Sequence, residues 1–577
     1  MKNLLIRDLS SQLNITGCAI SKREPEYLNW IGSNLTDIAD EFVRENNLLK
    51  SYFVKNMNIV FKTTRFELLL QRWVVEYLLK LFNLMNDSTL AKQALVLEDC
   101  YLNRFGVNKY YSKFGTLPEI EWRPSGGLAQ KIFSILVRSV NVLYISLNKG
   151  LRISGKTKKY KIMREAIWGL YDFHGYYYHD DFLVDNVVVE KHDLLLFSRG
   201  IPTCRDRLKG YQDAKKSSYA HFNLYSLSIS LKTLFFRVIP KYIFSATKIF
   251  FQESVSGDFS LYWSVYSSFI YNALPYEKIF SNFEIVSELG HNYFSVGHIA
   301  EAVICQNYGA RYYLMHWSDN SVPTNKFLLS FLGCDKFLIW GNAHACGIRG
   351  HSQITMPTGY VFKRFIKEIM FNKSKILSDM GIDAKGKIIS FFDETFGEEC
   401  YTKEGHIIVF WETALKLAET EKDSTVLVKP KELEKFNNLS RDSKRRFMEI
   451  KSKIESLPNM HIIDSYKWSF MEVVGVSDVV VTQGMSSSAT IAIICGVEGL
   501  YLDMVQEEHP FSKLFKDRIV FYDPEKLLSM IQRIIKGLES PLKDIPKAIL
   551  TDYDAYRDDC GIERFRRILT GNNINQP

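Results

Sequence analysis

Three consecutive serines stand between apolar runs near the end of the chain. Ser486, Ser487 and Ser488 follow SDVVVTQGM and precede ATIAIICG, and a further apolar run, GLYLDM, comes next. The runs predict a buried strand, a helix and a second strand. In such a unit, serine hydroxyls and the free amides of the first helical turn point to where a phosphate binds. With Gln483 and Gly484 they predict a nucleotide-phosphate site, and the alternative is a serine-rich cap on an ordinary helix.

Two further groups of polar residues end predicted strands of the same half. They are Asp393, Glu394 and Thr395 after IISFF, and Lys429, Pro430 and Lys431 at the end of STVLVKPK. Ligands of open α/β sheets bind beyond the carboxyl ends of the strands, so these groups and the serines should share one edge. Cations, hydroxyls and helix amides together offset the charge of a departing phosphate without a metal. The three groups therefore support the same phosphate site.

A different phosphate motif lies earlier in the chain. Residues Gly150–Thr157, GLRISGKT, fit the P-loop pattern with Lys156 as the phosphate ligand. They stand between SVNVLYISL, a predicted strand, and KYKIMREAIWGLYDF, a predicted helix. The loop interior is Leu-Arg-Ile, and such bulky residues hinder backbone amides from wrapping around phosphate. A P-loop ATPase or kinase is therefore an alternative function, and a basic surface turn is the simpler interpretation.

Length and composition limit the class of protein. A chain of 577 residues is too long for one core, and 46% hydrophobic with 24% charged residues is typical of a soluble globular protein. The formal charge of +8 favours anionic ligands or an anionic membrane surface and does not call for nucleic acid. The nine cysteines form no CxxC pair, which argues against a zinc site or a disulfide framework. Without a signal peptide or an apolar run of membrane-spanning length, we expect a cytoplasmic protein.

The order of predicted elements indicates the fold class. Residues 1–130 are predicted to be helical, with a loop around GTLPEIEWRPSGG, and strands alternate with helices from residue 131 on. FEIVSEL, RYYLMHWS and CDKFLIWG are strands of a first set, with TNKFLLSFLG as one of its helices. A second set follows a connector near residues 361–380. We therefore predict an α/β fold with two Rossmann-like domains facing across a cleft and an extra helical N-terminal region.

One apolar segment also carries positive charge. Residues 224–251 include Arg237, Lys241 and Lys248, which fall on one side of a helical wheel, and Pro240, which should kink the helix. Such a segment can lie on an anionic bilayer surface. The alternative is a buried helix pair whose basic side chains extend outward to water.

The second set of elements resembles a known family. A strand ending in VKPK, a strand ending in HIID, a helix with Trp468 and Phe470, and then SDVVVTQGMSSSATIAIICG occur in this order. This order resembles the C-terminal half of GT-B glycosyltransferases of bacterial surface-polysaccharide biosynthesis. It is similar to Kdo transferases and bacterial sialyltransferases, and more distantly to CDP-glycerol glycerophosphotransferases. Those families bind the nucleotide phosphate with a His-Pro pair and a serine pair, and here Lys429-Pro430 stands in place of His-Pro.

The resemblance covers roughly residues 280–570 and implies an organisation and an activity. The helical region predicted over 1–130 matches no family, and after it we expect an acceptor domain over 131–370, a nucleotide-donor domain over 371–550 and a helix that crosses back over 551–577. The implied reaction transfers a sugar, such as Kdo or sialic acid, from a nucleotide donor to a glycan or lipid-linked glycan of O-antigen, capsule or lipopolysaccharide. A CMP-linked donor is favoured, no other cofactor is expected, and peripheral contact with the inner membrane fits such an acceptor. A non-catalytic scaffold of an assembly complex is the further alternative.

In this family type the first domain supplies the catalytic base. The candidates at its predicted strand ends are Glu288 after FEIVS, His316, Asp319 and Asn320 after RYYLM, and Asp180 and Asp181 in GYYYHDD. An inverting transfer needs a carboxylate or histidine within reach of the acceptor hydroxyl, and a retaining double displacement needs a carboxylate nucleophile. We favour Glu288 and Asp319, with His316 as a third candidate. A salt bridge, a loop cap or a structural histidine is the alternative for each.

Two pairs of acids invite a metal interpretation. Asp180-Asp181 lacks the intervening residue of a DxD motif, and Asp552 and Asp554 lie in the predicted terminal helical region. We therefore expect an enzyme that does not depend on a metal ion.

Overall fold

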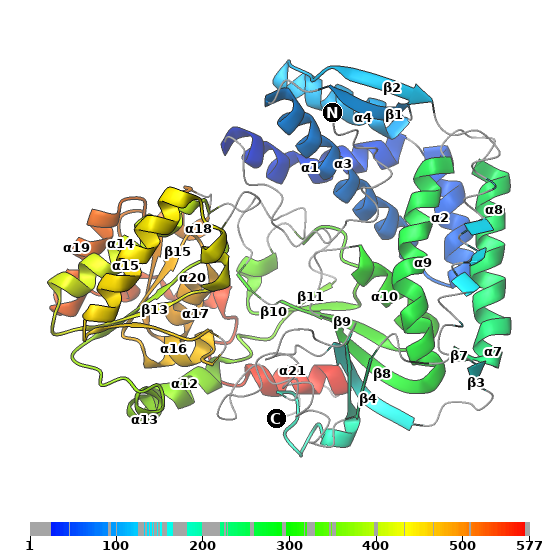
Figure 1. Ribbon diagram of the computed structural model, residues 1–577. Coiled ribbons are helices and arrows are strands. Elements are labelled where there is room, and N and C mark those ends of the chain that lie inside the picture. Colours follow the sequence, from blue (N-terminus) through cyan, green and yellow to red (C-terminus); the bar gives the residue numbers. More distant parts are fainter. Residues whose placement is uncertain are drawn as a thin grey trace.

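The computed structural model describes most of the chain between residues 25 and 571, and Figure 1 shows two α/β sheets side by side with a helical region next to the first. The description does not extend to residues 1–24, 46, 91–93, 100, 125–131, 133–135, 138, 141, 144–146, 148–150, 153–157, 166–181, 199–219, 224–226, 228, 254–258, 291–295, 317, 320–328, 346–347, 349–353, 397–401, 432, 466, 507–508 and 572–577.

The N-terminal region is helical, as predicted, and also contains a small sheet. Its helices are α1 (Pro25–Glu45), α2 (Asn47–Phe61), α3 (Phe66–Leu90) and α4 (Tyr101–Phe114). The strands β1 (Leu95–Asp99) and β2 (Ile120–Pro124) pair in parallel, although a loop was predicted around β2.

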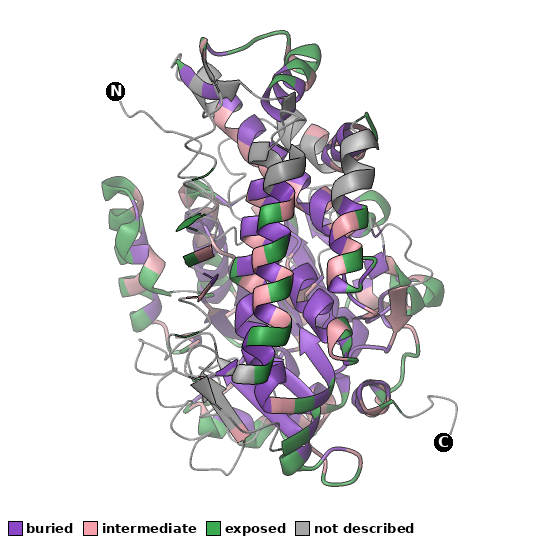
Figure 2. Cartoon of the chain, turned by 90° about the vertical axis from the view of Figure 1, so that its right-hand side faces the viewer, coloured by how far each residue is buried: buried purple, intermediate pink, exposed green. Residues whose placement is uncertain are grey.

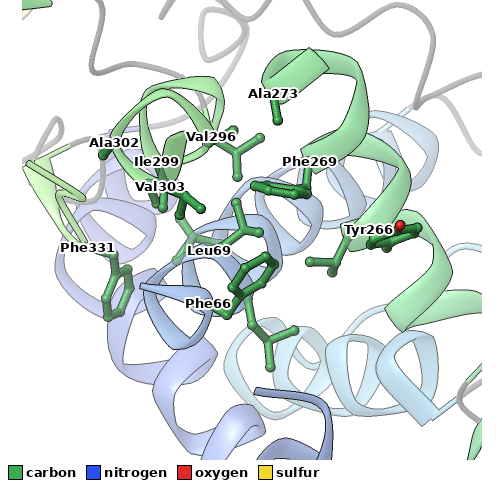
Figure 3. Packing of buried hydrophobic residues seen from close by; sticks show 14 of the residues in the cluster. Phe66, Leu69, Tyr266, Phe269, Ala273, Val296, Ile299, Ala302, Val303 and Phe331 are labelled. Atoms are coloured by element: carbon green, nitrogen blue, oxygen red, sulfur yellow. The ribbon is translucent and has the colours of Figure 1, made fainter. Parts of the chain in front are cut away.

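The N-terminal helices share one core with the first sheet. Figure 3 shows Phe66 and Leu69 of α3 against Tyr266 and Phe269 of α9 (Phe259–Asn282) and close to α10 (Gly297–Asn307). The ring centroids of Phe66 and Phe269 lie 4.9 Å apart. Because α9 and α10 cover the first sheet, the helical region is packed onto that domain.

The first sheet has seven parallel strands. In spatial order it runs β11-β10-β9-β8-β4-β5-β6. The strands are β4 (Lys158–Glu165), β5 (Leu194–Ser198), β6 (Ala220–Asn223), β8 (Phe283–Gly290), β9 (Arg311–Met315), β10 (Lys336–Ile339) and β11 (Thr355–Pro357). The chain reverses its winding between β4 and β8, which is the switch point of a doubly wound sheet.

The second sheet has six parallel strands in the order β14-β13-β12-β15-β16-β17. They are β12 (Ile388–Phe392), β13 (Thr425–Lys429), β14 (Met460–Ile462), β15 (Val479–Gln483), β16 (Glu498–Leu502) and β17 (Val520–Phe521). The main helices around it are α14 (Glu404–Thr420), α15 (Arg441–Ser456), α16 (Phe470–Val476), α17 (Ser487–Cys495) and α19 (Pro524–Ile535). This is the strand order of the Rossmann fold, with its switch point between β12 and β15.

These two sheets confirm the predicted fold class, two Rossmann-like domains of the GT-B kind with an extra helical N-terminal region. After the second sheet come α18 (Pro510–Leu514), α20 (Lys547–Tyr553) and α21 (Gly561–Thr570). The last helix, red in Figure 1, lies against β4 and β8 of the first sheet. Ser287 donates a hydrogen bond of 2.9 Å to the carbonyl of Leu569, and Arg566 donates one of 2.9 Å to that of Leu183.

Two predictions around the first sheet were wrong, and a third was wrong over the part that the structure describes. The described residues among 139–147, predicted as the strand SVNVLYISL, are helical. The start of the predicted helix KYKIMREAIWGLYDF is β4, because Tyr160, Ile162 and Met163 are buried at the centre of the sheet, where tertiary packing overrides local propensity. The described end of TNKFLLSFLG, residues 329–333, is irregular.

The basic segment does not extend Lys241 and Lys248 outward to water, which was one of its two predicted arrangements. Residues 234–253 form a continuous helix, η4 (Leu234–Ile243) and α8 (Phe244–Glu253), with Pro240 inside a π-helical stretch. Lys241 Nζ donates a hydrogen bond of 2.6 Å to Asn307 Oδ1, and Lys248 Nζ donates one of 2.7 Å to Asn56 Oδ1. Both cations therefore point toward neighbouring helices of the protein. Phenylalanines occupy the outward face. Among the described residues, no helix has the length and apolar character needed to cross a bilayer.

Candidate functional site

The three polar groups of the second half meet at the switch point of the second sheet. β13, β12 and β15 are neighbours in that sheet and run in parallel, so their carboxyl ends lie at one edge. Residues 393–395 follow β12, residues 430–431 follow β13, and residues 484–486 follow β15. Ligands of doubly wound sheets bind where the strand order reverses, here between β12 and β15. The predicted proximity of the three groups is therefore observed.

Glu394 connects the three strand ends. Its side chain forms an ion pair with Lys431 Nζ, and its backbone amide donates a hydrogen bond of 3.3 Å to Gln483 Oε1. Although burial raises the pKa of this carboxyl, Lys431, the Thr395 amide and the Ser486 hydroxyl together bring the pKa of Glu394 below its usual range. Glu394 is therefore ionised, and Lys431 is held at the edge.

Asp393 and Lys429 have perturbed pKa values at the same edge. Asp393 accepts hydrogen bonds from Trp411 Nε1 at 3.2 Å and from the amide of Lys431 at 2.5 Å. Burial, to which the charge of Glu394 adds, raises the pKa of Asp393 to about 7 despite these bonds. Burial also lowers the pKa of Lys429 to about 8, against the attraction of Asp393. Strongly shifted groups gathered at one sheet edge are typical of functional sites.

The serines begin α17 as predicted. Ser486 is the N-cap residue, with φ −80° and ψ 146°, yet its side chain makes no capping hydrogen bond. Gly484, at φ +60°, makes the tight turn from β15 into the helix in a conformation that favours glycine. From Ala489 to Cys495 the helix is buried, whereas the three serines are half-buried. The first amides of α17 thus face the same edge as the charged groups, an arrangement suited to an anion.

Two buried polar atoms at this edge have no hydrogen-bond partner within the described part of the chain. They are Gln483 Nε2 and Glu472 Oε1, and these two residues are 2% and 0% exposed. Burial raises the pKa of Glu472, and Lys429 opposes this rise. Sequence reasoning missed Glu472. Its only sequence signal is the S-x-x-E pattern of a capping box, in which the Ser469 amide donates a hydrogen bond of 2.7 Å to Glu472 Oε2. Unsatisfied buried groups beside an open edge mark where a ligand would bond.

The first sheet brings histidines to its own carboxyl edge. His316 directly follows β9, and His344 lies in η6 (Asn342–Ala345) after β10. Their ring centroids are 4.5 Å apart. Burial, together with His344, lowers the pKa of His316 well below its usual range, and burial also lowers that of His344. Both imidazoles are therefore uncharged at neutral pH.

Asp319 joins these histidines to the second domain. Its Oδ1 lies 3.6 Å from His344 Nε2, and its Oδ2 lies 3.6 Å from His509 Nε2. Thr490 of α17 donates a hydrogen bond of 2.5 Å to Oδ2, and the Thr490 and Tyr501 hydroxyls are 2.8 Å apart. No sequence motif marks His344, His509 or Thr490, because only the packing of the two domains brings them together.

Glu288 is placed differently from the prediction. It lies within β8 rather than after it, is 1% exposed, and accepts a hydrogen bond of 2.9 Å from Cys305 Sγ of α10. In this structure Glu288 is part of the core of the first domain, and its role as a base stays a prediction. Asn320, Asp180 and Asp181 lie outside the described residues.

The terminal acids have a structural role. Asp554 forms a buried ion pair of 2.7 Å with Lys363 Nζ and accepts 3.0 Å from the amide of Tyr360. Asp552 lies in α20, where its carbonyl faces Gly341 so closely that a side chain at Gly341 would clash. Within the described ranges, no group of three or more His, Cys, Asp or Glu residues is arranged to hold a metal ion.

The P-loop alternative fails on its structural context. A P-loop must lead into a helix whose N-terminus binds the phosphate. Here the chain resumes after Thr157 as the strand β4, and Leu151 and Arg152 form the short strand β3, which pairs with β7 (Ile229–Ser230). Residues 153–157 lie outside the described part.

No protein-family model and no curated protein matches the chain. Among solved structures, it is similar to the wall teichoic acid polymerase TagF, with 10% identity over 77% of this chain and 96% of that chain and a TM-score of 0.42. It is also similar to the UDP-GlcNAc 2-epimerase of Methanocaldococcus jannaschii, with 10% identity over 72% and 100% of the chains and a TM-score of 0.39. A UDP-forming α,α-trehalose-phosphate synthase from Burkholderia xenovorans has 10% identity over 60% and 86%, with a TM-score of 0.31. The fold class of the chain follows from its own two sheets.

Proposed function

We propose that this protein is a glycosyltransferase that moves a sugar from a nucleotide donor to a growing bacterial surface glycan. One observation carries the proposal. At the switch point of the second sheet, the start of α17 meets Glu394, Lys429 and Lys431. Helix amides, hydroxyls and two lysines are the groups that hold and stabilise a departing nucleotide phosphate.

The donor follows from the same groups and from the family resemblance. Lys429 and Lys431 supply the positive charge that a His-Pro pair would otherwise place near the phosphate. A CMP-linked acidic sugar, such as Kdo or sialic acid, is the donor that we propose. The acceptor is a glycan or lipid-linked glycan of O-antigen, capsule or lipopolysaccharide. With two lysines present, the leaving phosphate does not need a divalent cation.

The acceptor side follows from the first sheet. An uncharged imidazole can take a proton from a hydroxyl at neutral pH, so we propose His316 as the catalytic base. His316 and His344 are each 1% exposed, so an acceptor reaches them only when the domains separate. Asp319 Oδ1 lies near His344, and Asp319 Oδ2 accepts a hydrogen bond from Thr490. We therefore give Asp319 a supporting role beside the histidines rather than the role of the base.

A nucleotide panel tests the proposal. The melting temperature of the protein is measured with CMP, UDP, GDP and ATP, and transfer is then assayed with sugar donors of the nucleotide that stabilises most. The proposal expects the largest rise with CMP and loss of that rise in the double variant Ser487→Ala/Ser488→Ala. A rise with ATP alone would favour a kinase or ATPase. No rise with any nucleotide would favour the non-catalytic scaffold and reject the proposed function.

We also propose that the protein contacts an anionic membrane through the outward face of η4 and α8. Phe235, Phe236 and Phe244 are 57%, 77% and 62% exposed there, and Lys232 is exposed beside them. Figure 2 looks onto the side of the molecule that α2, α8 and α9 form. Aromatic side chains flanked by cations bind the interface of anionic bilayers. Such contact would bring the enzyme to a lipid-linked acceptor.

Vesicle sedimentation tests this contact. The triple variant Phe235→Ser/Phe236→Ser/Phe244→Ser should lose binding to vesicles of phosphatidylglycerol and phosphatidylcholine. Phe371→Ser is the matched control, because Phe371 is 90% exposed on α12 (Lys363–Phe371) and lies outside the patch. Equal binding of the triple variant and the wild type would reject the contact.

A further inference from the structure

Asp319 lies in the first domain, and its side chain contacts residues of both domains. It follows β9 of the first sheet, and its side chain is 1% exposed. Two of its partners come from the second domain, Thr490 of α17 and His509 at the N-cap of α18, and one, His344, comes from its own domain. The carboxylate therefore lies at the junction of the domains.

The bond to Thr490 belongs to the closed arrangement. A buried carboxylate carries a large desolvation penalty, which only hydrogen bonds and nearby positive charge offset. The Thr490 hydroxyl donates a hydrogen bond of 2.5 Å to Asp319 Oδ2, and a hydrogen bond to a carboxylate is a strong one that offsets part of this penalty. If the domains separate, water replaces Thr490 and the penalty disappears. We therefore expect the Thr490–Asp319 hydrogen bond when the domains are closed, and an Asp319 side chain bonded to water when they are open.

His509 is held so that it faces Asp319. Its Nδ1 accepts a hydrogen bond of 3.0 Å from the amide of Phe511, which places the ring proton on Nε2. Nε2 is the nitrogen that lies 3.6 Å from Asp319 Oδ2. The second domain therefore presents two donors, a hydroxyl and an imidazole N–H, to one carboxylate oxygen.

The junction is linked to both proposed half-sites. Thr490 comes two residues after Ser488, within the helix whose first turn forms the phosphate site. Asp319 comes three residues after His316. His344, on the other side of Asp319, is buried and has no hydrogen-bond partner at either ring nitrogen within the described structure. A short path of contacts thus runs from the phosphate site to the histidines.

We propose that Asp319 is a positioning residue that couples nucleotide binding at α17 to closure of the two domains over the histidine pair. This inference rests on the proposed function for the identity of the ligand. A nucleotide phosphate fixes the first turn of α17, and Thr490 in that helix then holds Asp319 and closes the junction. By linkage, loss of the Thr490–Asp319 bond weakens nucleotide binding and opens the junction together.

Hydrogen–deuterium exchange measured by mass spectrometry tests the coupling, with CMP and UDP as probes. In the wild type, the nucleotide should slow exchange both in residues 487–495 and, across the junction, in residues 336–345. In Asp319→Asn and Thr490→Val, it should slow exchange only in residues 487–495, with nucleotide affinity reduced on the order of tenfold. Thr490→Ser keeps the hydroxyl and should behave as the wild type.

Thr413 provides a matched control for Thr490. Thr413→Val makes the same change in α14, where the Thr413 hydroxyl bonds its own helix at Val409, and should leave the response unchanged. Protection of residues 336–345 that persists in Asp319→Asn and Thr490→Val would overturn the coupling. If neither nucleotide protects residues 487–495, the proposed function fails instead. The Thr490–Asp319 contact is then tested without ligand, and unchanged exchange of residues 336–345 in both Asp319→Asn and Thr490→Val would reject its role in closing the junction.

Discussion

The hydroxyl of Thr490 donates a 2.5 Å hydrogen bond to Asp319, although the two residues belong to different Rossmann-like domains. Thr490 lies in the helix that begins with the three serines, and Asp319 lies beside the buried histidines. The proposed donor site and the proposed base are therefore linked through one hydrogen bond between the domains.

The first prediction concerns the charge of Lys429. Its pKa is lowered to about 8, chiefly by burial, so it carries a full charge at pH 6 and loses it as the pH rises through 8. Since a phosphate binds the protonated form, nucleotide affinity should fall across that range. Calorimetric titration with CMP from pH 6.5 to 9.5 measures this change. Lys429→Arg stays charged and should lose the fall around pH 8, keeping only the one that ionisation of Asp393 causes around pH 7. The same fall around pH 8 in this variant would assign the titration to another group.

The second prediction concerns the stability of the second domain. Burial raises the pKa of Asp393 to about 7, above the ordinary value of 3.8 that it has when unfolded. Between these values the folded state binds more protons, so the free energy of unfolding due to Asp393 falls as the pH rises from about 4 to about 7. The whole effect is on the order of 4 kcal/mol.

Asp393→Asn cannot ionise and should remove that dependence. Urea unfolding at pH 5 and pH 7.5, followed by tryptophan fluorescence, compares the two proteins. The variant should lose less stability than the wild type between these pH values. Parallel changes in both proteins would mean that Asp393 is ionised throughout.

The third prediction concerns metal ions. Because Lys429 and Lys431 lie at the proposed phosphate site, the rate of sugar transfer should be the same with EDTA as with added Mg²⁺ or Mn²⁺. Dialysis against EDTA followed by the transfer assay measures this. A rate that disappears with EDTA and returns with Mg²⁺ would show that the lysines do not suffice.

The second domain could be predicted from sequence because its strands are buried on both faces. β12 and β15 are buried at every position, and such strands appear as continuous apolar runs whose polar ends mark the sheet edge. Knowing the ends of three neighbouring strands was enough to predict which groups meet.

The first domain was harder because its chemistry depends on tertiary contacts. Glu288 looked like a residue after a strand, since nothing in the sequence indicated that Cys305 would hydrogen-bond it inside the core. KYKIMRE has a helical pattern, yet it forms the central strand β4. His344 and His509 carry no motif and come together only through the packing of the two domains.

The central claim is that the start of α17 binds a nucleotide phosphate, and calorimetric titration of the double variant Ser487→Ala/Ser488→Ala with CMP tests it most directly. Each lost hydrogen bond to a charged group is worth about 1.5–3 kcal/mol, so affinity should fall at least tenfold. The melting temperature should stay near that of the wild type, because both serines are only half-buried. Unchanged affinity for CMP in a folded double variant would contradict the claim.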